Sequence, residues 1–140
     1  MIISFFFLKN KISLKERTKL KSFIEILFKK EGFKLKSLTY VFCSDEYLLQ
    51  LNQEFLNHDY YTDILTFDLS LTKEKEGEIY ISVDRIKDNA KKIRRSLNEE
   101  LHRVIFHGAL HLCGYQDKAK AEQKEMTARE NYYLNRYFIK

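Results

Sequence analysis

The feature that most constrains this chain is a long apolar stretch toward its C-terminal end, which carries three histidines and stops at a glycine. Its apolar side chains recur three and four positions apart, which predicts a helix capped at its start by Asn98. The apolar positions are Leu101, Val104, Ile105, Ala109, Leu110 and Leu112. A helix this apolar is stable only when other elements pack against it, so we expect a layered domain around it.

Four shorter segments predict strands. Apolar or alternating runs occupy residues 2–8, 38–42, 62–69 and 78–82. A charged turn at residues 72–77 separates the last two runs, which predicts that they pair as a hairpin.

Helical spacing predicts four further helices. The first is expected to begin at a capping box, Ser13 with Glu16, and to reach Gly32, and Ser44 is expected to cap the second. The other two cover residues 84–95 and 118–137, and the latter offers Met126 and Tyr133 to the core. The sequence therefore predicts a single α+β domain over residues 1–140, in which about five helices pack on a small mixed four-stranded sheet.

Composition excludes several classes of protein. The 140 residues include no proline, four glycines and two cysteines, which excludes collagen-like, Pro/Gly low-complexity and disulfide-scaffold proteins. A hydrophobic content of 44% excludes a disordered chain. The apolar run at residues 2–8 is too short for a membrane helix or a signal peptide. Together with two unpaired-looking thiols, Cys43 and Cys113, this predicts a cytoplasmic protein.

The charge balance is mildly basic. Lys and Arg number 25 against 20 Asp and Glu, which gives a net charge of +5. This excess is compatible with a polyanionic partner, and equally with the ordinary soluble surface of a lysine-rich proteome.

The segment from His107 to Asp117 has the spacing of a metal site. His107 and His111 stand four residues apart on the predicted helix, so their imidazoles share one face. Gly114 can take a positive φ and end the helix, and the returning chain then offers the Asp117 carboxylate as a third ligand. The alternative is that both histidines are packed helix residues and Gly114 is an ordinary C-cap. His102 lies on another face, where we expect a surface or outer-sphere histidine.

One residue type is missing from this segment. Zinc metalloproteases carry a glutamate directly after the first histidine as general base, whereas Gly108 occupies that position here. A peptidase of that type is therefore disfavoured.

These residues resemble the bacterial YbeY endoribonucleases, whose signature is His-Gly-x-Leu-His-Leu-x-Gly-Tyr-Asp-His. Residues 107–115 match its first nine positions, counting the two free ones. Residues 51–67 and 77–82 are similar to two upstream segments of the family, and Glu122, Met126 and Glu130 fall on the spacing of its last helix. The resemblance runs from about residue 38 to residue 133.

The resemblance implies a zincin-like metal helix and a cytoplasmic, zinc-dependent, single-strand-specific endoribonuclease. Such an enzyme matures the 3′ end of 16S ribosomal RNA and takes part in ribosome quality control. The expected partners are ribosomal RNA and the small subunit, with no membrane and no DNA.

By position, the resemblance makes His107 and His111 ligands of one Zn²⁺, and the third family ligand, a histidine, falls on Asp117. A carboxylate there should hold zinc less tightly, or accept harder metals more readily. No side chain is assigned as the catalytic group, because water on the metal would take that role. The Gln116 position departs from the family aspartate, and Tyr61 from the proline before Thr62.

A further departure concerns phosphate binding. The family arginine expected near the site falls on Leu56, which cannot donate to an anion. Arg103, Lys118 and His58 are therefore the candidates for contacting RNA. Two alternatives stay open: a non-catalytic, zinc-stabilised ribosome-assembly or RNA-binding factor, which Leu56 and Asp117 favour, and a metal-dependent hydrolase of another substrate.

Overall fold

The computed structural model describes residues 2–8, 12–56 and 62–139, and its centre is a four-stranded sheet. The strands are β1 (Ile3–Phe7), β2 (Leu35–Cys43), β3 (Ile64–Asp68) and β4 (Lys75–Ser82), in the spatial order β1-β2-β4-β3. β1, β2 and β4 run parallel, whereas β3 pairs antiparallel with β4 and forms an edge of the sheet. The predicted hairpin and the predicted mixed sheet are thus confirmed.

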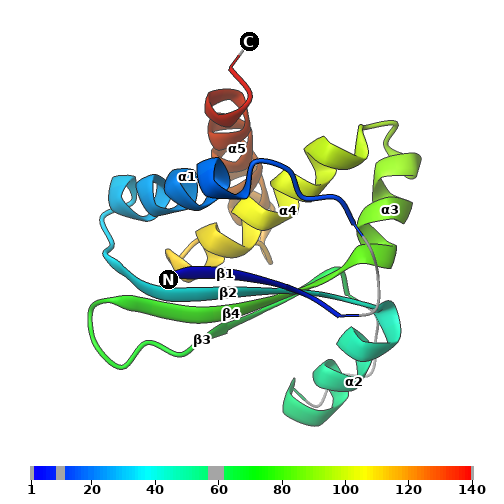
Figure 1. Ribbon diagram of the computed structural model, residues 1–140, viewed down its shortest axis with the longest axis horizontal. Coiled ribbons are helices and arrows are strands. Elements are labelled where there is room, and N and C mark those ends of the chain that lie inside the picture. The colour runs from blue at the N-terminus through cyan, green and yellow to red at the C-terminus, as the bar shows by residue number, and fades with distance from the viewer. Residues whose placement is uncertain (1, 9–11, 57–61, 140) are drawn as a thin grey trace.

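Five helices surround the sheet (Figure 1). They are α1 (Arg17–Lys30), α2 (Asp45–Leu56), α3 (Val83–Lys92), α4 (Leu97–Leu112) and α5 (Lys120–Tyr137). α1 and α4 cover one face, α5 packs against α4, and α2 lies on the opposite side of the sheet (Figure 1). The predicted α+β class is confirmed. Among the described residues, no helix has the length and apolar character that crossing a membrane requires.

The apolar stretch with the three histidines forms α4, the central helix of the main core. Its residues Val104, Ile105 and Leu110 are buried against the sheet and the neighbouring helices. The hydroxyl of Tyr40, on β2, donates a hydrogen bond to the carbonyl oxygen of Ile105 at 2.9 Å. Burial of apolar area and this cross-layer bond fix α4, and therefore its histidines, relative to the sheet.

Gly108 allows α4 to lie close to the sheet. A Cβ atom at this position would come within 2.9 Å of Ile79 on β4 and 3.0 Å of Ile64 on β3. Both distances are shorter than ordinary carbon–carbon contact, about 3.5–4.0 Å. The glycine therefore sets the depth at which α4 sits in the core.

Two predicted helix starts are wrong. α1 begins at Arg17, and Glu16 before it has a positive φ of 52° with no capping hydrogen bond from its side chain, so Ser13 and Glu16 form no capping box. The N-cap of α4 is Ser96, whose Oγ accepts from the Glu99 N–H at 3.0 Å, and Asn98 lies within the first turn. Serine and asparagine are about equally good N-cap residues, so the helix can begin two residues earlier, after Ser96.

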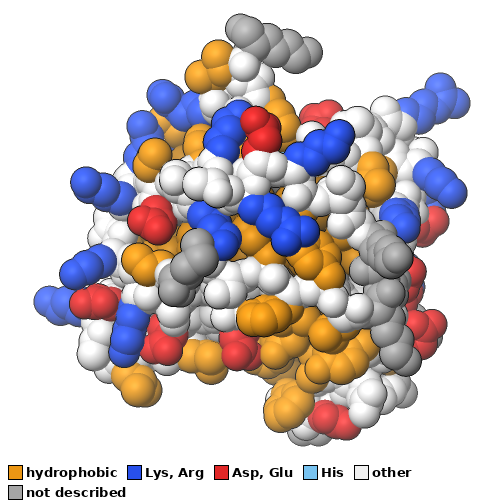
Figure 2. All heavy atoms as spheres, viewed as in Figure 1, with side chains coloured by type: hydrophobic (Ala, Val, Ile, Leu, Met, Phe, Trp, Pro, Cys, Tyr) orange, Lys and Arg blue, Asp and Glu red, His pale blue; other side chains and the backbone are white. Residues whose placement is uncertain are grey.

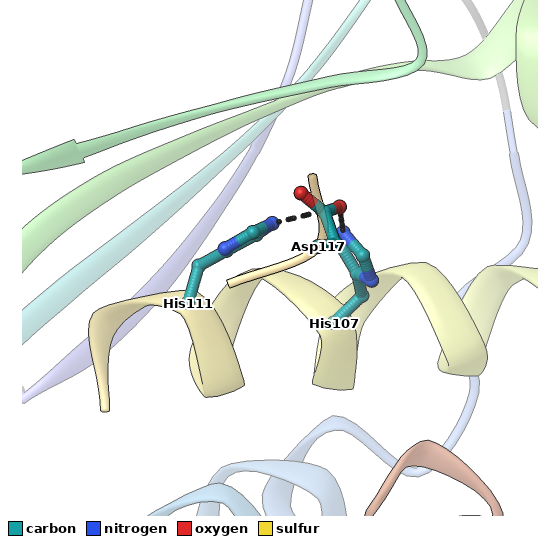
Figure 3. A group of neighbouring side chains, drawn as sticks. All are labelled: His107, His111 and Asp117. Atoms are coloured by element: carbon teal, nitrogen blue, oxygen red, sulfur yellow. Dashed lines mark ion pairs between the residues drawn. The ribbon is translucent and has the colours of Figure 1, made fainter. Parts of the chain in front are cut away.

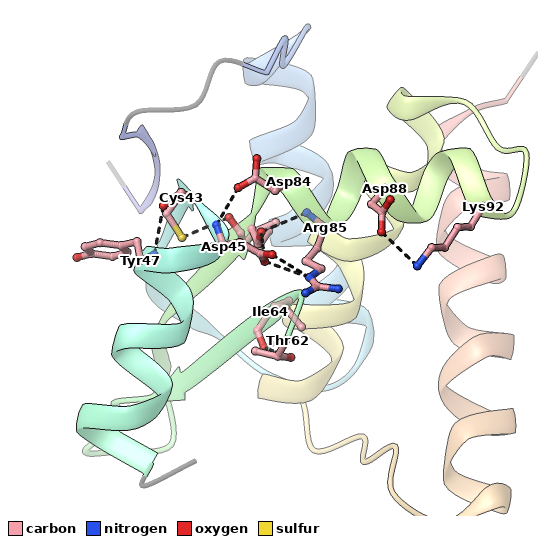
Figure 4. A network of polar contacts seen from close by, with 12 residues as sticks. Cys43, Asp45, Tyr47, Thr62, Ile64, Asp84, Arg85, Asp88 and Lys92 are labelled. Atoms are coloured by element: carbon pink, nitrogen blue, oxygen red, sulfur yellow. Dashed lines mark hydrogen bonds and ion pairs between the residues drawn. The ribbon is translucent and has the colours of Figure 1, made fainter. Parts of the chain in front are cut away.

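The predicted cap of α2 is confirmed, and a polar cluster adds to it (Figure 4). The Oγ of Ser44 accepts from the Tyr47 N–H at 3.2 Å. The Asp45 carboxylate accepts from the Ser82 hydroxyl at 3.0 Å and from the Arg85 guanidinium at 3.1 Å. The Asp45 N–H in turn donates to Asp84 at 2.9 Å. These contacts join the starts of α2 and α3 at the end of the parallel strands.

Candidate metal centre

The last two turns of α4 and the loop that follows bring three side chains together. The helix ends in a Schellman motif: the N–H of Gly114 donates to the carbonyl of His111 at 3.0 Å, and that of Tyr115 to the carbonyl of Leu110 at 3.1 Å. Gly114 has the positive φ that this motif requires, 104°, as the sequence predicted. The chain then turns back and places Asp117 over the helix face that carries the histidines (Figure 3).

The three side chains point at one another. The Asp117 Oδ2 lies 3.2 Å from the Nε2 of His107 and 3.3 Å from the Nε2 of His111. The two imidazole planes stand at 86°, with ring centroids 4.5 Å apart. One candidate ligand atom from each residue lies within 4.8 Å of the others, and no other such group occurs among the described parts of the chain.

Both imidazoles are oriented through their second nitrogen. The Nδ1 of His107 lies 2.5 Å from the Glu130 carboxylate, and the Nδ1 of His111 lies 2.9 Å from the carbonyl oxygen of Tyr115. Each Nδ1 therefore carries the proton and donates, which leaves the Nε2 lone pairs directed at Asp117. Two imidazole nitrogens and one carboxylate oxygen are the donor set of a catalytic zinc site, so these residues fit such an ion.

Glu130, on α5, joins the site to a second ion pair. Its other oxygen accepts from the guanidinium of Arg103 at 2.8 Å, and Arg103 also donates to the Asn131 side chain at 2.6 Å. Burial lowers the pKa of His107, but the hydrogen bond to Glu130 and the negative charges of Glu130, Asp117 and Asp63 together outweigh burial, so the pKa lies above its ordinary 6.5. The carboxylate thus holds the His107 ring firmly in one orientation.

The expected RNA-contacting residues lie in different surroundings. Arg103 points into the domain, where its guanidinium is engaged by Glu130 and Asn131. Lys118 is exposed directly after Asp117, whereas His58 and Tyr61 lie outside the described residues. Leu56, at the position of the family arginine, is the last residue of α2 and is 40% exposed.

The expectation for His102 is wrong. This residue is 2% exposed, and its ring packs among Phe106, Tyr137 and Phe138. Its Nδ1 lies 2.7 Å from the Asn98 carbonyl oxygen. Burial lowers its pKa, so His102 is a neutral core residue of α4 on a face turned away from the candidate ligands.

A hollow of about 290 Å³ adjoins the candidate centre. It lies between the edge strand β3 and the end of α4, and its lining residues are Ile64, Leu65, Thr66, Asp68, His111 and Leu112. Among the described strands, β3 pairs only with β4, and four of its residues line this hollow. A chain lying in the hollow would therefore pass beside His111.

Glu130 is the site residue whose role the sequence pattern did not predict. Its position was noticeable only as part of the regular spacing with Glu122 and Met126 on the last helix. The contact that defines its role joins residues 23 positions apart, and such a contact follows from the packing of α5 on α4.

A family profile, curated relatives and a solved structure all match most of this chain. The profile of the family described as Endoribonuclease YbeY matches residues 6–138. The Endoribonuclease YbeY of Cytophaga hutchinsonii is 48% identical over 134 residues, covering 95% of this chain and 94% of the relative. That of Flavobacterium psychrophilum is 39% identical and covers 91% of each chain. The solution structure of TM1509 from Thermotoga maritima superposes with a TM-score of 0.65 at 28% identity, covering 97% of this chain and 89% of that one.

Proposed function

Because the chain belongs to the YbeY family of endoribonucleases, we propose that it is a metal-dependent, single-strand-specific endoribonuclease acting in the cytoplasm on the 3′ end of 16S ribosomal RNA. The observation that carries the proposal is the convergence of His107, His111 and Asp117 on one point, beside a hollow on the protein surface. The whole chain, residues 1–140, forms the one metallohydrolase domain that performs this reaction.

The three converging side chains hold one Zn²⁺ ion. When bound, the ion supplies a Lewis acid that polarises a phosphodiester oxygen and favours attack by water near neutral pH. The protein's own contribution is to orient the ligands: Glu130 fixes the ring of His107, and the Tyr115 carbonyl fixes the ring of His111.

RNA lies in the hollow along the edge strand β3. Lys118, exposed beside Asp117, contacts a phosphate, and His58 is a second candidate for such a contact. Arg103 belongs to the same machinery but acts on Glu130, because its guanidinium is already engaged there. On the face shown in Figure 2, Lys and Arg side chains are interspersed with Asp and Glu. A net charge of +5 adds a diffuse attraction for RNA that weakens as salt increases.

The proposal is tested by cleavage of single-stranded RNA. Wild-type protein should cleave, should lose activity when a chelator removes the metal, and should regain it when zinc is returned. His111→Ala should be inactive, whereas Gln116→Ala, an exposed change in the same loop, should cleave normally. Equal cleavage by metal-free and zinc-loaded protein would show that the metal does not participate.

One observation favours a second candidate, a non-catalytic RNA-binding factor in ribosome assembly. Leu56 ends α2 without the guanidinium that the family resemblance leads one to expect. A large gain of cleavage in Leu56→Arg would indicate that the wild-type enzyme is weak. Turnover by the wild-type protein alone removes this candidate.

A further inference from the structure

A partly buried carboxylate contacts the loop that carries Asp117, outside the candidate metal centre. Glu31 follows the last turn of α1, and its side chain is 9% exposed. Its Oε1 accepts from the hydroxyl of Tyr115 at 2.8 Å. Its Oε2 accepts from the guanidinium of Arg129 at 2.5 Å and from the hydroxyl of Tyr133. Both oxygens of one carboxylate are thus satisfied by donors from distant parts of the sequence.

Tyr115 connects this carboxylate to the metal ligands. Its hydroxyl donates to Glu31, while its backbone carbonyl accepts from the Nδ1 of His111 at 2.9 Å. Two residues further on, the same loop carries Asp117. The position of Tyr115 therefore affects both the ring of His111 and the placement of the third ligand.

Apart from the ring of Tyr115, which packs against the main core, the loop has few buried contacts to fix it. Gly114, Gln116 and Lys118 are exposed, and a Cβ at Gly114 would have no neighbour within 4 Å. The Asp117 side chain is itself 39% exposed. A loop with so few buried contacts opens readily unless a specific interaction holds it.

The interaction between Glu31 and its donors is strong. Burial raises the pKa of Glu31, but the hydrogen bonds from Tyr133, Arg129 and Tyr115 outweigh burial, and the pKa lies below its ordinary 4.5. The carboxylate is therefore charged at neutral pH, and hydrogen bonds to a charged acceptor are stronger than neutral ones.

From these contacts we infer that Glu31 is a positioning residue of the metal centre. Its carboxylate anchors Tyr115, so that the Tyr115 carbonyl orients His111 and the loop presents Asp117 to the ion. The inference rests on the proposed metal site. It assigns a role at that site to a residue of α1, far from the histidine segment in sequence.

The alternative role for Glu31 is purely structural, as a tie between α1 and α5 through Arg129 and Tyr133. The two carboxylate oxygens separate the roles, because Oε1 serves Tyr115 and Oε2 serves the residues of α5. Tyr115→Phe removes only the bond to the loop. Tyr133→Phe removes one bond between Glu31 and α5, together with the bond that Tyr133 accepts from Arg129 within α5, and leaves the bond to the loop intact, so it is the matched control.

The experiment titrates metal-free protein with Co²⁺ as the probe, reading affinity by chelator competition and coordination geometry from the visible absorption spectrum. Glu31→Gln and Tyr115→Phe should each weaken Co²⁺ binding about tenfold, as removal of an outer-sphere partner does, and should alter the spectrum. The double variant should bind no more weakly than either single one. Tyr133→Phe should lower the melting temperature yet keep the wild-type affinity and spectrum.

Wild-type affinity and spectrum in Tyr115→Phe and Glu31→Gln would overturn the inference. An equal loss of affinity in Tyr133→Phe would also overturn it, because the role would then be structural. His111→Ala separates this failure from failure of the proposed site. If His111→Ala loses Co²⁺ while Glu31→Gln binds normally, only the inference fails; if His111→Ala binds like the wild type, the metal site itself is wrong.

Discussion

At the scale of single residues, the candidate centre depends on partners that are not themselves ligands. His107 and His111 use their Nδ1 atoms to bond with Glu130 and with the Tyr115 carbonyl, and this directs their Nε2 atoms toward Asp117. The spacing of the ligands was predictable, because residues four apart share a helix face and a glycine reverses the chain. Glu130 was not predictable from local spacing, because its contact depends on how α5 packs against α4.

Glu130 bonds to both His107 and Arg103, so replacing it should affect metal binding and stability together. In Glu130→Gln the amide cannot carry the charge that pairs with Arg103 and orients His107. Zinc affinity should fall by roughly 10- to 100-fold, and the protein should lose about 1–3 kcal/mol of stability because a partly buried guanidinium loses its charged partner. Chelator competition and urea unfolding measure the two effects. Unchanged zinc affinity in Glu130→Gln would contradict the assigned role.

At the scale of elements, the depth of α4 in the core positions the site. Periodicity predicted this helix and its burial, whereas its start at Ser96 and the buried environment of His102 depended on tertiary contacts. Helix propensity disfavours a glycine inside a helix by about 1 kcal/mol, yet Gly108 occurs in the middle of α4. The close approach of Ile79 and Ile64 explains its presence.

Gly108→Ala tests this packing. Propensity alone predicts a gain of about 1 kcal/mol, but forcing a methyl group against Ile79 costs typically 1–3 kcal/mol. We expect a net loss of stability of about 1 kcal/mol, measured by urea unfolding. Adding Ile79→Val, which removes one of the two crowding carbons, should recover part of the loss. A Gly108→Ala protein more stable than the wild type would show that a methyl group fits between α4 and the sheet without strain.

At the scale of the whole molecule, one α+β domain brings together residues from distant parts of the chain. The class of fold, the number of helices and the pairing of β3 with β4 followed from hydrophobic pattern and turn residues, whereas the parallel pairing of β1, β2 and β4 did not. The carboxylate of Glu31 illustrates what did not follow: three donors from two other segments converge on it, and no local pattern marks such a cluster.

This cluster makes stability depend on pH. The pKa of Glu31 is lower in the folded protein than its ordinary 4.5, so its contribution to stability is complete above that value and is lost as pH falls through the folded-state pKa. In metal-free protein, the difference in melting temperature between wild type and Glu31→Gln should therefore shrink as pH is lowered from about 6 to about 3. A difference in melting temperature that stays constant over this pH range would contradict a charged Glu31 carboxylate in the folded protein.

The central claim is that His107, His111 and Asp117 hold one metal ion in this domain. Elemental analysis of purified protein tests it most directly, with Gln116→Ala as the control for changes in the loop. We predict one zinc per chain in the wild type and in Gln116→Ala, and almost none in His111→Ala at an unchanged far-ultraviolet circular dichroism spectrum. A full equivalent of zinc in His111→Ala would contradict the claim.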